Sequence, residues 1–123
     1  MPQKRILIID DDNRNIFALK AVLKAKGFDC LSATSAQEGF ALMEQSDNVT
    51  IVLMDMMMPD MDGYQAIATM KKSAKMQNIP VLAVTAQAMV GDKERCLSAG
   101  ASGYVSKPIN VDELLIQIEN FTS

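Results

Sequence analysis

A series of short apolar runs, each followed by a longer amphipathic stretch, is the feature that most constrains the fold of this chain. The clearest run covers residues 51–55, where four apolar residues, two of them β-branched, end in a carboxylate. A run this short and this apolar is typical of a strand buried on both faces of a parallel sheet. Similar runs predict strands at residues 6–9 and 81–84, and two further short strands are expected at 28–33 and 103–105.

The stretches between these runs have the periodicity of helices with one apolar face. The positions of residues 13–26 that are expected to face the core are Ile16, Phe17, Leu19, Val22 and Leu23. Ser35 and Glu38 have the spacing of a capping box and open a second helix. The remaining helices are expected at residues 63–73, at 88–99, and after Asn110 with Leu114, Leu115, Ile118 and Phe121 facing inward.

Five strand–helix units predict the fold class, which is α/β. We expect a (βα)5 fold with a doubly wound, five-stranded parallel sheet covered by helices on both faces. Residues 1–123 are expected to form one domain, because the chain has the length of a single domain. In such sheets, binding and chemistry gather at the carboxyl ends of the strands.

Composition excludes several classes of function. The chain has no histidine, which removes histidine-dependent nucleophiles and most zinc sites. Its net charge is −3 and its basic residues are scattered, so no nucleic acid partner is expected. No apolar run has the length of a membrane span and no signal peptide is expected, so we predict no membrane contact. Cys30 and Cys96 lack the CxxC spacing and are expected to be free thiols of a cytoplasmic protein.

Polar side chains stand at the ends of four of the predicted strands: Asp10 and Asp11, then Asp55, Thr85 and Lys107. Parallel strands bring these ends to one edge, where three carboxylates repel one another. A divalent cation such as Mg²⁺ relieves this repulsion, and one carboxylate is then available as a nucleophile. Lysine and threonine supply the charge and the hydroxyl donor that an incoming phosphoryl group needs.

Each of these residues also has a simpler explanation when it is taken alone. Asp10 or Asp11 is able to cap the first helix, and Thr85 the fourth. Lys107, taken alone, is typical of an ordinary lysine on the protein surface. We assign Asp12, the third acid of its run, to a cap or to solvent. The joint placement of the others at four strand ends favours the functional interpretation.

Four motifs in order carry a resemblance to the receiver domain of two-component response regulators. They are residues 8–11 (IIDD), 54–63 (MDMMMPDMDG), 84–86 (VTA) and 100–108 (GASGYVSKP). The resemblance runs from residue 6 to about residue 121, and the spacing between the motifs also fits the family. It implies the flavodoxin/CheY-like strand order 2-1-3-4-5.

The resemblance implies a site and its partners. Asp55 would accept a phosphoryl group from a histidine of a histidine kinase or a histidine phosphotransfer protein. Asp11 would bind Mg²⁺ (or Mn²⁺) directly and Asp10 largely through water, with Asp55 and the Met57 backbone carbonyl as further ligands. The protein would catalyse only its own phosphorylation and dephosphorylation, and would not be an enzyme with a separate substrate.

The resemblance also implies a switch. Thr85 and Lys107 would bind the phosphoryl group, and Tyr104 would follow Thr85 inward. Lys107–Pro108 matches a peptide bond that is cis in the family. A downstream protein would bind a face made of residues 88–93, Tyr104 and residues 111–118. We further predict that the side chains of Met57 and Gln87 flank the phosphoryl group and set how fast water reaches it.

Two other functions share parts of this pattern. A hydrolase of the haloacid-dehalogenase type also uses an aspartate, magnesium and a lysine, but it needs a second aspartate where this chain has Met57. A flavodoxin shares the architecture, but residues 10–12 would repel the phosphate of its cofactor. The sequence is consistent with a stand-alone regulator or with a receiver excised from a hybrid sensor kinase, and residues 13–15 and 91–97 resemble the latter.

Overall fold

The computed structural model describes residues 5–86 and 91–122, in which strands and helices alternate. The elements are β1 (Arg5–Ile9), α1 (Asn13–Ala25), β2 (Asp29–Ala33), α2 (Ala36–Gln45), β3 (Val49–Asp55), α3 (Gly63–Lys71), β4 (Val81–Thr85), α4 (Asp92–Ala99), β5 (Gly103–Ser106) and α5 (Val111–Thr122). The strands form one parallel sheet in the order β2-β1-β3-β4-β5. The predicted fold class and strand order are confirmed.

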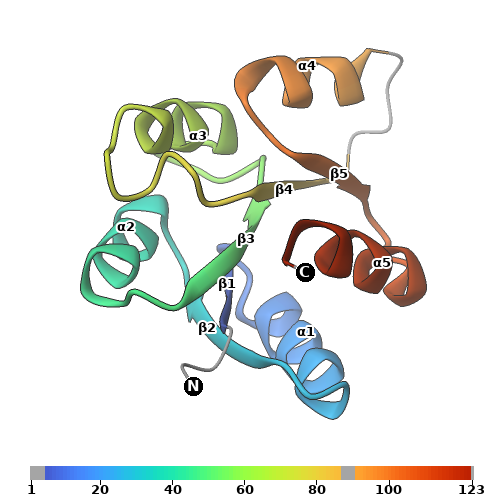
Figure 1. Cartoon of the computed structure of the whole chain (residues 1–123). Helices are drawn as coiled ribbons and strands as arrows, with labels where there is room; N and C mark the ends of the chain where they lie inside the picture. Colours follow the sequence, from blue (N-terminus) through green and yellow to red (C-terminus); the bar gives the residue numbers. More distant parts are fainter. Residues whose placement is uncertain (1–4, 87–90, 123) are drawn as a thin grey trace.

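Helices cover both faces of the sheet, with α1 and α5 on one side and α2, α3 and α4 on the other (Figure 1). Side chains along each strand alternate between the two faces. Leu7 and Ile9 of β1 therefore pack in the cluster under α2 and α3, whereas Ile6 and Ile8 pack in the cluster under α1 and α5. Two apolar cores fix the sheet from both sides and leave the carboxyl ends of its strands at one edge.

Helix α1 turns most, but not all, of its predicted apolar positions inward. Ile16, Leu19 and Leu23 are buried, and Val22 is half-buried. The prediction for Phe17 was wrong, because its side chain is 77% exposed. It follows Ile16 directly, and one residue turns a helix by about 100°, which points Phe17 away from the sheet.

Helix α5 departs from its prediction in the same way at its end. Leu114 and Ile118 are buried, and Leu115 packs partly against the same core. Phe121 was expected inside but is 39% exposed. Its ring lies over Gly103, where a β-carbon would stand 3.2 Å from a ring atom.

Side chains cap the helices that the sequence marked. Asp12 is the N-cap of α1, and its carboxylate accepts the Arg14 backbone N–H at 2.9 Å. Ser35 Oγ accepts the Glu38 backbone N–H at 3.2 Å, which satisfies one of the free donors at the start of α2. The last helix is capped in the same way, since the Asn110 side chain accepts the Glu113 backbone N–H at 3.1 Å.

The remaining expectations about elements are met in part. The third helix ends at Lys71 rather than at residue 73. The predicted start of the fourth helix, at residue 88, lies outside the described residues, and the described part of α4 begins at Asp92. Cys30 and Cys96 are free thiols, as predicted. None of the helices in the described ranges has the length and apolar character needed to span a membrane.

Candidate functional site

Three acidic residues meet at the carboxyl edge of the sheet, where β1 and β3 lie side by side. Asp10 and Asp11 directly follow β1, and Asp55 is the last residue of β3. One carboxylate oxygen from each of the three lies within 4.8 Å of the others. Asp10 is 4% exposed and Asp55 is 5% exposed, whereas Asp11 is open to solvent. The sequence pattern therefore identified a real cluster.

The two buried carboxylates are held in the same way. Oδ1 of Asp10 accepts the Asp12 backbone N–H at 2.8 Å, and Oδ1 of Asp55 accepts the Met57 backbone N–H at 3.0 Å. The other oxygen of each, Oδ2, faces Lys107 Nζ, at 3.8 Å for Asp10 and 3.9 Å for Asp55. One ammonium group thus stands opposite two buried carboxylates and offsets part of their mutual repulsion.

The backbone of Lys107 is tied to the neighbouring strand. Its N–H donates to the carbonyl oxygen of Thr85 at 2.8 Å, which joins the end of β5 to the end of β4. The peptide bond between Lys107 and Pro108 is cis. Lys107 is therefore presented to the acids by the sheet itself, although it is far from them in the sequence.

Electrostatics favour a bound cation at this edge. Burial raises the pKa of Asp55 above its ordinary value, and the Asp10 and Asp11 carboxylates add to the rise. The Met57 N–H and Lys107 lower that pKa without cancelling the rise. Carboxylate oxygens are hard donors of the kind that Mg²⁺ prefers. The donor set therefore fits a small, hard divalent cation.

The other predicted site residues lie around this cluster. Thr85 ends β4 and is 2% exposed, one residue beyond Val84, which pairs with Asp55. Tyr104 lies in β5, opposite Ala83. The Met57 side chain is 53% exposed in the loop that follows Asp55. The position of Gln87 lies outside the described residues.

Two features of this region were not recognised in the sequence. Gly63 lies so close to the loop after β3 that a β-carbon there would stand 2.8 Å from Met56 Cα. Asp92 at the start of α4 is 5% exposed and accepts hydrogen bonds from both tyrosines. The signal for Gly63 was its place at the first position of a helical stretch, but no local pattern links Asp92 to its partners.

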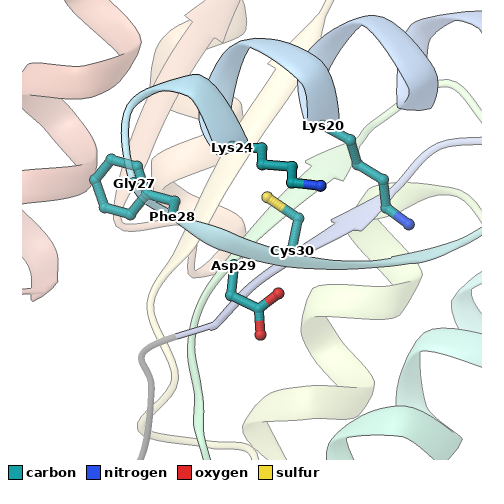
Figure 2. A pocket seen from close by; sticks show the side chains of 6 residues that line it. All are labelled: Lys20, Lys24, Gly27, Phe28, Asp29 and Cys30. Carbon is teal, nitrogen blue, oxygen red and sulfur yellow. The ribbon is translucent and has the colours of Figure 1, made fainter.

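A separate hollow of about 450 Å³ lies between α1 and β2 (Figure 2). Cys30 points from β2 toward the helix that carries Lys20 and Lys24, while Asp29 points the other way and pairs with Arg5 at 2.9 Å. Burial, reinforced by the charge of Asp29, raises the pKa of Cys30 to about 11. The thiol is therefore protonated at neutral pH, and this hollow shares no residue with the acidic cluster.

Comparison with known proteins gives concordant matches. Residues 6–119 match the response regulator receiver domain family. The chain is 30% identical over 118 residues to the polar-differentiation response regulator DivK of Brucella ovis, and the match covers 96% of this chain and 95% of DivK. It is 36% identical over 126 residues to the hybrid signal transduction histidine kinase I of Dictyostelium discoideum, covering 98% of this chain and 7% of that kinase.

A solved structure gives the same picture. The receiver domain of sensor histidine kinase PA1611 from Pseudomonas aeruginosa PAO1 has a TM-score of 0.88 and 27% identity, over 98% of each chain. That structure has a magnesium ion coordinated in its active site cleft. A family match over nearly the whole chain, the DivK relative and the 2-1-3-4-5 sheet agree with one another. This chain therefore belongs to the response regulator receiver family and is a receiver domain of two-component signalling.

Proposed function

We propose that the protein is a phosphorylation-dependent switch in which Asp55 accepts a phosphoryl group from a histidine of a partner protein. The observation that carries this proposal is the arrangement of Lys107 Nζ opposite the Oδ2 atoms of Asp10 and Asp55, beside the exposed Asp11. Phosphoryl transfer depends mainly on positioning and on neutralising charge. This cluster offers both at one edge of the sheet.

Four groups would hold a divalent cation: the carboxylates of Asp10, Asp11 and Asp55 and the backbone carbonyl of Met57. Mg²⁺ is the ion we propose, with Mn²⁺ as a substitute, because the donors are carboxylate and carbonyl oxygens. When bound, the ion supplies positive charge against the acids and the phosphoryl oxygens. The magnesium ion in the related Pseudomonas receiver supports this choice.

Side chains of the protein itself carry out the other parts of phosphoryl transfer. Oδ1 of Asp55 is engaged by the Met57 N–H, so Oδ2 is the nucleophile. The phosphorus–nitrogen bond to the partner histidine breaks as the phosphorus–oxygen bond to Oδ2 forms. The electron pair of the broken bond stays on the histidine nitrogen, and the imidazole, already protonated on its other ring nitrogen, leaves neutral. Lys107 neutralises charge on the new phosphoryl group, and the hydroxyl of Thr85 donates a hydrogen bond to it.

The phosphoryl group then acts on the rest of the domain through Thr85 and Tyr104. A carboxylate that becomes a dianionic acyl phosphate draws the Thr85 hydroxyl toward it, and Tyr104 follows. The face formed by α4, β5 and α5 carries the change to a downstream protein. Met57 and Gln87 set how fast water removes the phosphoryl group.

The relatives bear on the setting in which the chain acts. We propose that residues 1–123 act as one receiver domain in the cytoplasm, served by a histidine kinase or a histidine phosphotransfer protein. The matches to DivK and to a hybrid kinase support both a stand-alone regulator and a receiver within a longer protein. The matched family gives no support to the hydrolase alternative, and the sequence has Met57 where that class requires an aspartate.

Intact mass after incubation with acetyl phosphate and Mg²⁺ tests the proposal. We expect a gain of one phosphoryl group in the wild type and none in Asp55→Asn or in the presence of a chelator. Asp47→Asn, which changes an exposed carboxylate away from the site, is the matched control and should be phosphorylated normally. A phosphoryl group that still appears on Asp55→Asn, or an unmodified wild type, would contradict the assignment.

A further inference from the structure

Asp92 is the buried carboxylate of the described residues that lies outside the acidic cluster. It is the first residue of α4. Its Oδ2 accepts a hydrogen bond from the Tyr104 hydroxyl at 3.0 Å, and its Oδ1 accepts one from the Tyr64 hydroxyl at 3.3 Å. One carboxylate thus joins three elements: α3 through Tyr64, α4 through its own backbone, and β5 through Tyr104.

A buried carboxylate needs compensation, because the loss of its water is costly. None of the ion pairs found between the described residues includes Asp92. The two hydroxyl groups are therefore its side-chain hydrogen-bond partners, helped by the positive end of the α4 dipole. Hydrogen bonds to a charged acceptor are stronger than neutral ones, so an outward rotation of Tyr104 would lose the shorter of the two.

The surroundings keep both hydroxyl groups in the donor role. Burial, together with the hydrogen bond to Asp92, raises the pKa of Tyr104 to about 12. Burial also raises the pKa of Tyr64 to about 12, and its hydroxyl lies 3.7 Å from Cys96 Sγ. The Arg95 guanidinium lies 4.9 Å from the centre of the Tyr64 ring, which helps to fix that ring.

We propose that Asp92 is a positioning residue that holds Tyr104 inward, against α4, before any phosphoryl group is present. The unphosphorylated domain then already has a conformation close to the one that phosphorylated Asp55 favours. Phosphorylation therefore has to shift the conformational equilibrium less. This link to phosphorylation rests on the proposed function. The hold on Tyr104 itself rests only on the contacts of Asp92.

Population-shift arithmetic gives the size of the effect. The apparent affinity of the domain for the phosphoryl group is proportional to the fraction of molecules already in the state that binds this group well. Removing a hydrogen bond to a charged acceptor changes such an equilibrium by about tenfold. Asp92→Ala should therefore raise the concentration of acetyl phosphate needed for half-maximal phosphorylation of Asp55 by up to about tenfold.

Tyrosine fluorescence measures the hold on Tyr104 directly. The chain has two tyrosines and no tryptophan, so in a Tyr64→Phe background Tyr104 is the sole fluorophore of this kind. Quenching by acrylamide then reports its exposure. We expect the quenching constant to rise severalfold in Asp92→Ala as the ring leaves its acceptor, with the isosteric Asp92→Asn in between.

Glu94→Ala is the matched control. It also removes an acidic side chain from the first turn of α4, but Glu94 is exposed and is not a partner of either tyrosine in the hydrogen bonds found. It should leave both readouts unchanged. If Asp92→Ala melts below the working temperature, Asp92→Asn serves for both measurements, because it keeps the shape of the side chain.

The outcomes separate the two proposals. The proposal that Asp92 holds Tyr104 inward is overturned if the quenching constant is unchanged in both Asp92 variants. It is also overturned if the quenching constant rises as much in Glu94→Ala as in Asp92→Ala. A raised quenching constant with unchanged phosphorylation overturns its coupling to Asp55 and leaves the proposed function standing. If the wild type takes no phosphoryl group, the proposed function fails, and the quenching result still decides whether Asp92 holds Tyr104.

Discussion

The buried negative charge of Asp55 lowers the stability of the folded chain. It is 5% exposed, the Asp10 carboxylate lies beside it, and the nearest ammonium group is 3.9 Å away. Asp55→Asn keeps an oxygen for the Met57 N–H and removes the charge. We expect this variant to be more stable than the wild type at neutral pH without divalent cations, by about 1–2 kcal/mol. Thermal unfolding in a chelating buffer measures the difference.

The pH dependence of that difference follows from the raised pKa of Asp55. Because the folded chain binds this proton more tightly than the unfolded chain, the charge is a full penalty only above the raised pKa. The advantage of Asp55→Asn should therefore be present at neutral pH, shrink as the pH falls through the raised pKa, and vanish below the unfolded value. An advantage that stays constant from neutral to acid pH would contradict this account.

Met57 lies in the loop that follows Asp55, and its apolar side chain is 53% exposed. In the proposed function, this side chain lies over the approach of water to Asp55. If it limits the access of water to the phosphoryl group, Met57→Ala should shorten the lifetime of the phosphorylated protein by a few-fold, whereas Met57→Leu, which keeps an apolar cover, should not. The decay of the phosphorylated mass after removal of acetyl phosphate measures this. Equal lifetimes in all three proteins would exclude Met57 as a determinant of the rate.

At the scale of elements, the start of α3 holds the loop that follows Asp55. Asp62 caps the helix by accepting the Gln65 N–H at 2.9 Å, and the Asp62 N–H donates to Gln65 Oε1 at 3.1 Å. Gly63 then passes so close to Met56 that an added methyl group would stand 2.8 Å from its Cα. The backbone itself must move to admit a side chain there.

Gly63→Ala should therefore lower both stability and metal affinity. We expect a loss of about 1–3 kcal/mol from the forced shift, and weaker Mg²⁺ binding because the loop carries Met57. Asp62→Ala is the comparison, because it loosens the same helix start by about 1 kcal/mol without pressing on Met56. Calorimetric titration with Mg²⁺ distinguishes them, and equal affinities in the two variants would contradict the role given to Gly63.

Elements were predictable where local pattern decides them. The apolar runs marked every strand, and Ser35 and Asn110 marked helix starts, because strand burial and capping depend on neighbours in the sequence. Phe17 and Phe121 were misjudged because apolar character alone does not tell which side of a helix faces the sheet. The capping box that Asp62 and Gln65 form at the start of α3 was not predicted from the sequence.

The acidic cluster was predictable for a different reason. Parallel strands bring their carboxyl ends to one edge whatever the details of packing, so the ends of β1 and β3 had to meet. The contacts of Asp92 follow no such rule. They join residues 28 and 12 positions apart in the sequence through side-chain rotamers, which only the packed structure determines.

At the scale of the whole molecule, the acidic cluster forms only when the chain folds. Asp11 and Asp55 are far apart in the unfolded chain and meet only when β1 and β3 pair between the two apolar cores. A cation that binds all three acids therefore binds the folded chain and stabilises it by mass action. This gives a test of the metal site that does not depend on phosphorylation.

We expect Mg²⁺ to raise the midpoint of thermal unfolding in a concentration-dependent manner. At a hundredfold excess over its dissociation constant the gain in stability is about 2.7 kcal/mol, which corresponds to several degrees for a chain of this size. Asp11→Asn should lose most of this gain, because Asp11 is the exposed member of the cluster and has no structural partner in the hydrogen bonds and ion pairs of the described residues. Asp47→Asn should keep it, and the same gain in both variants would show that the ion binds elsewhere.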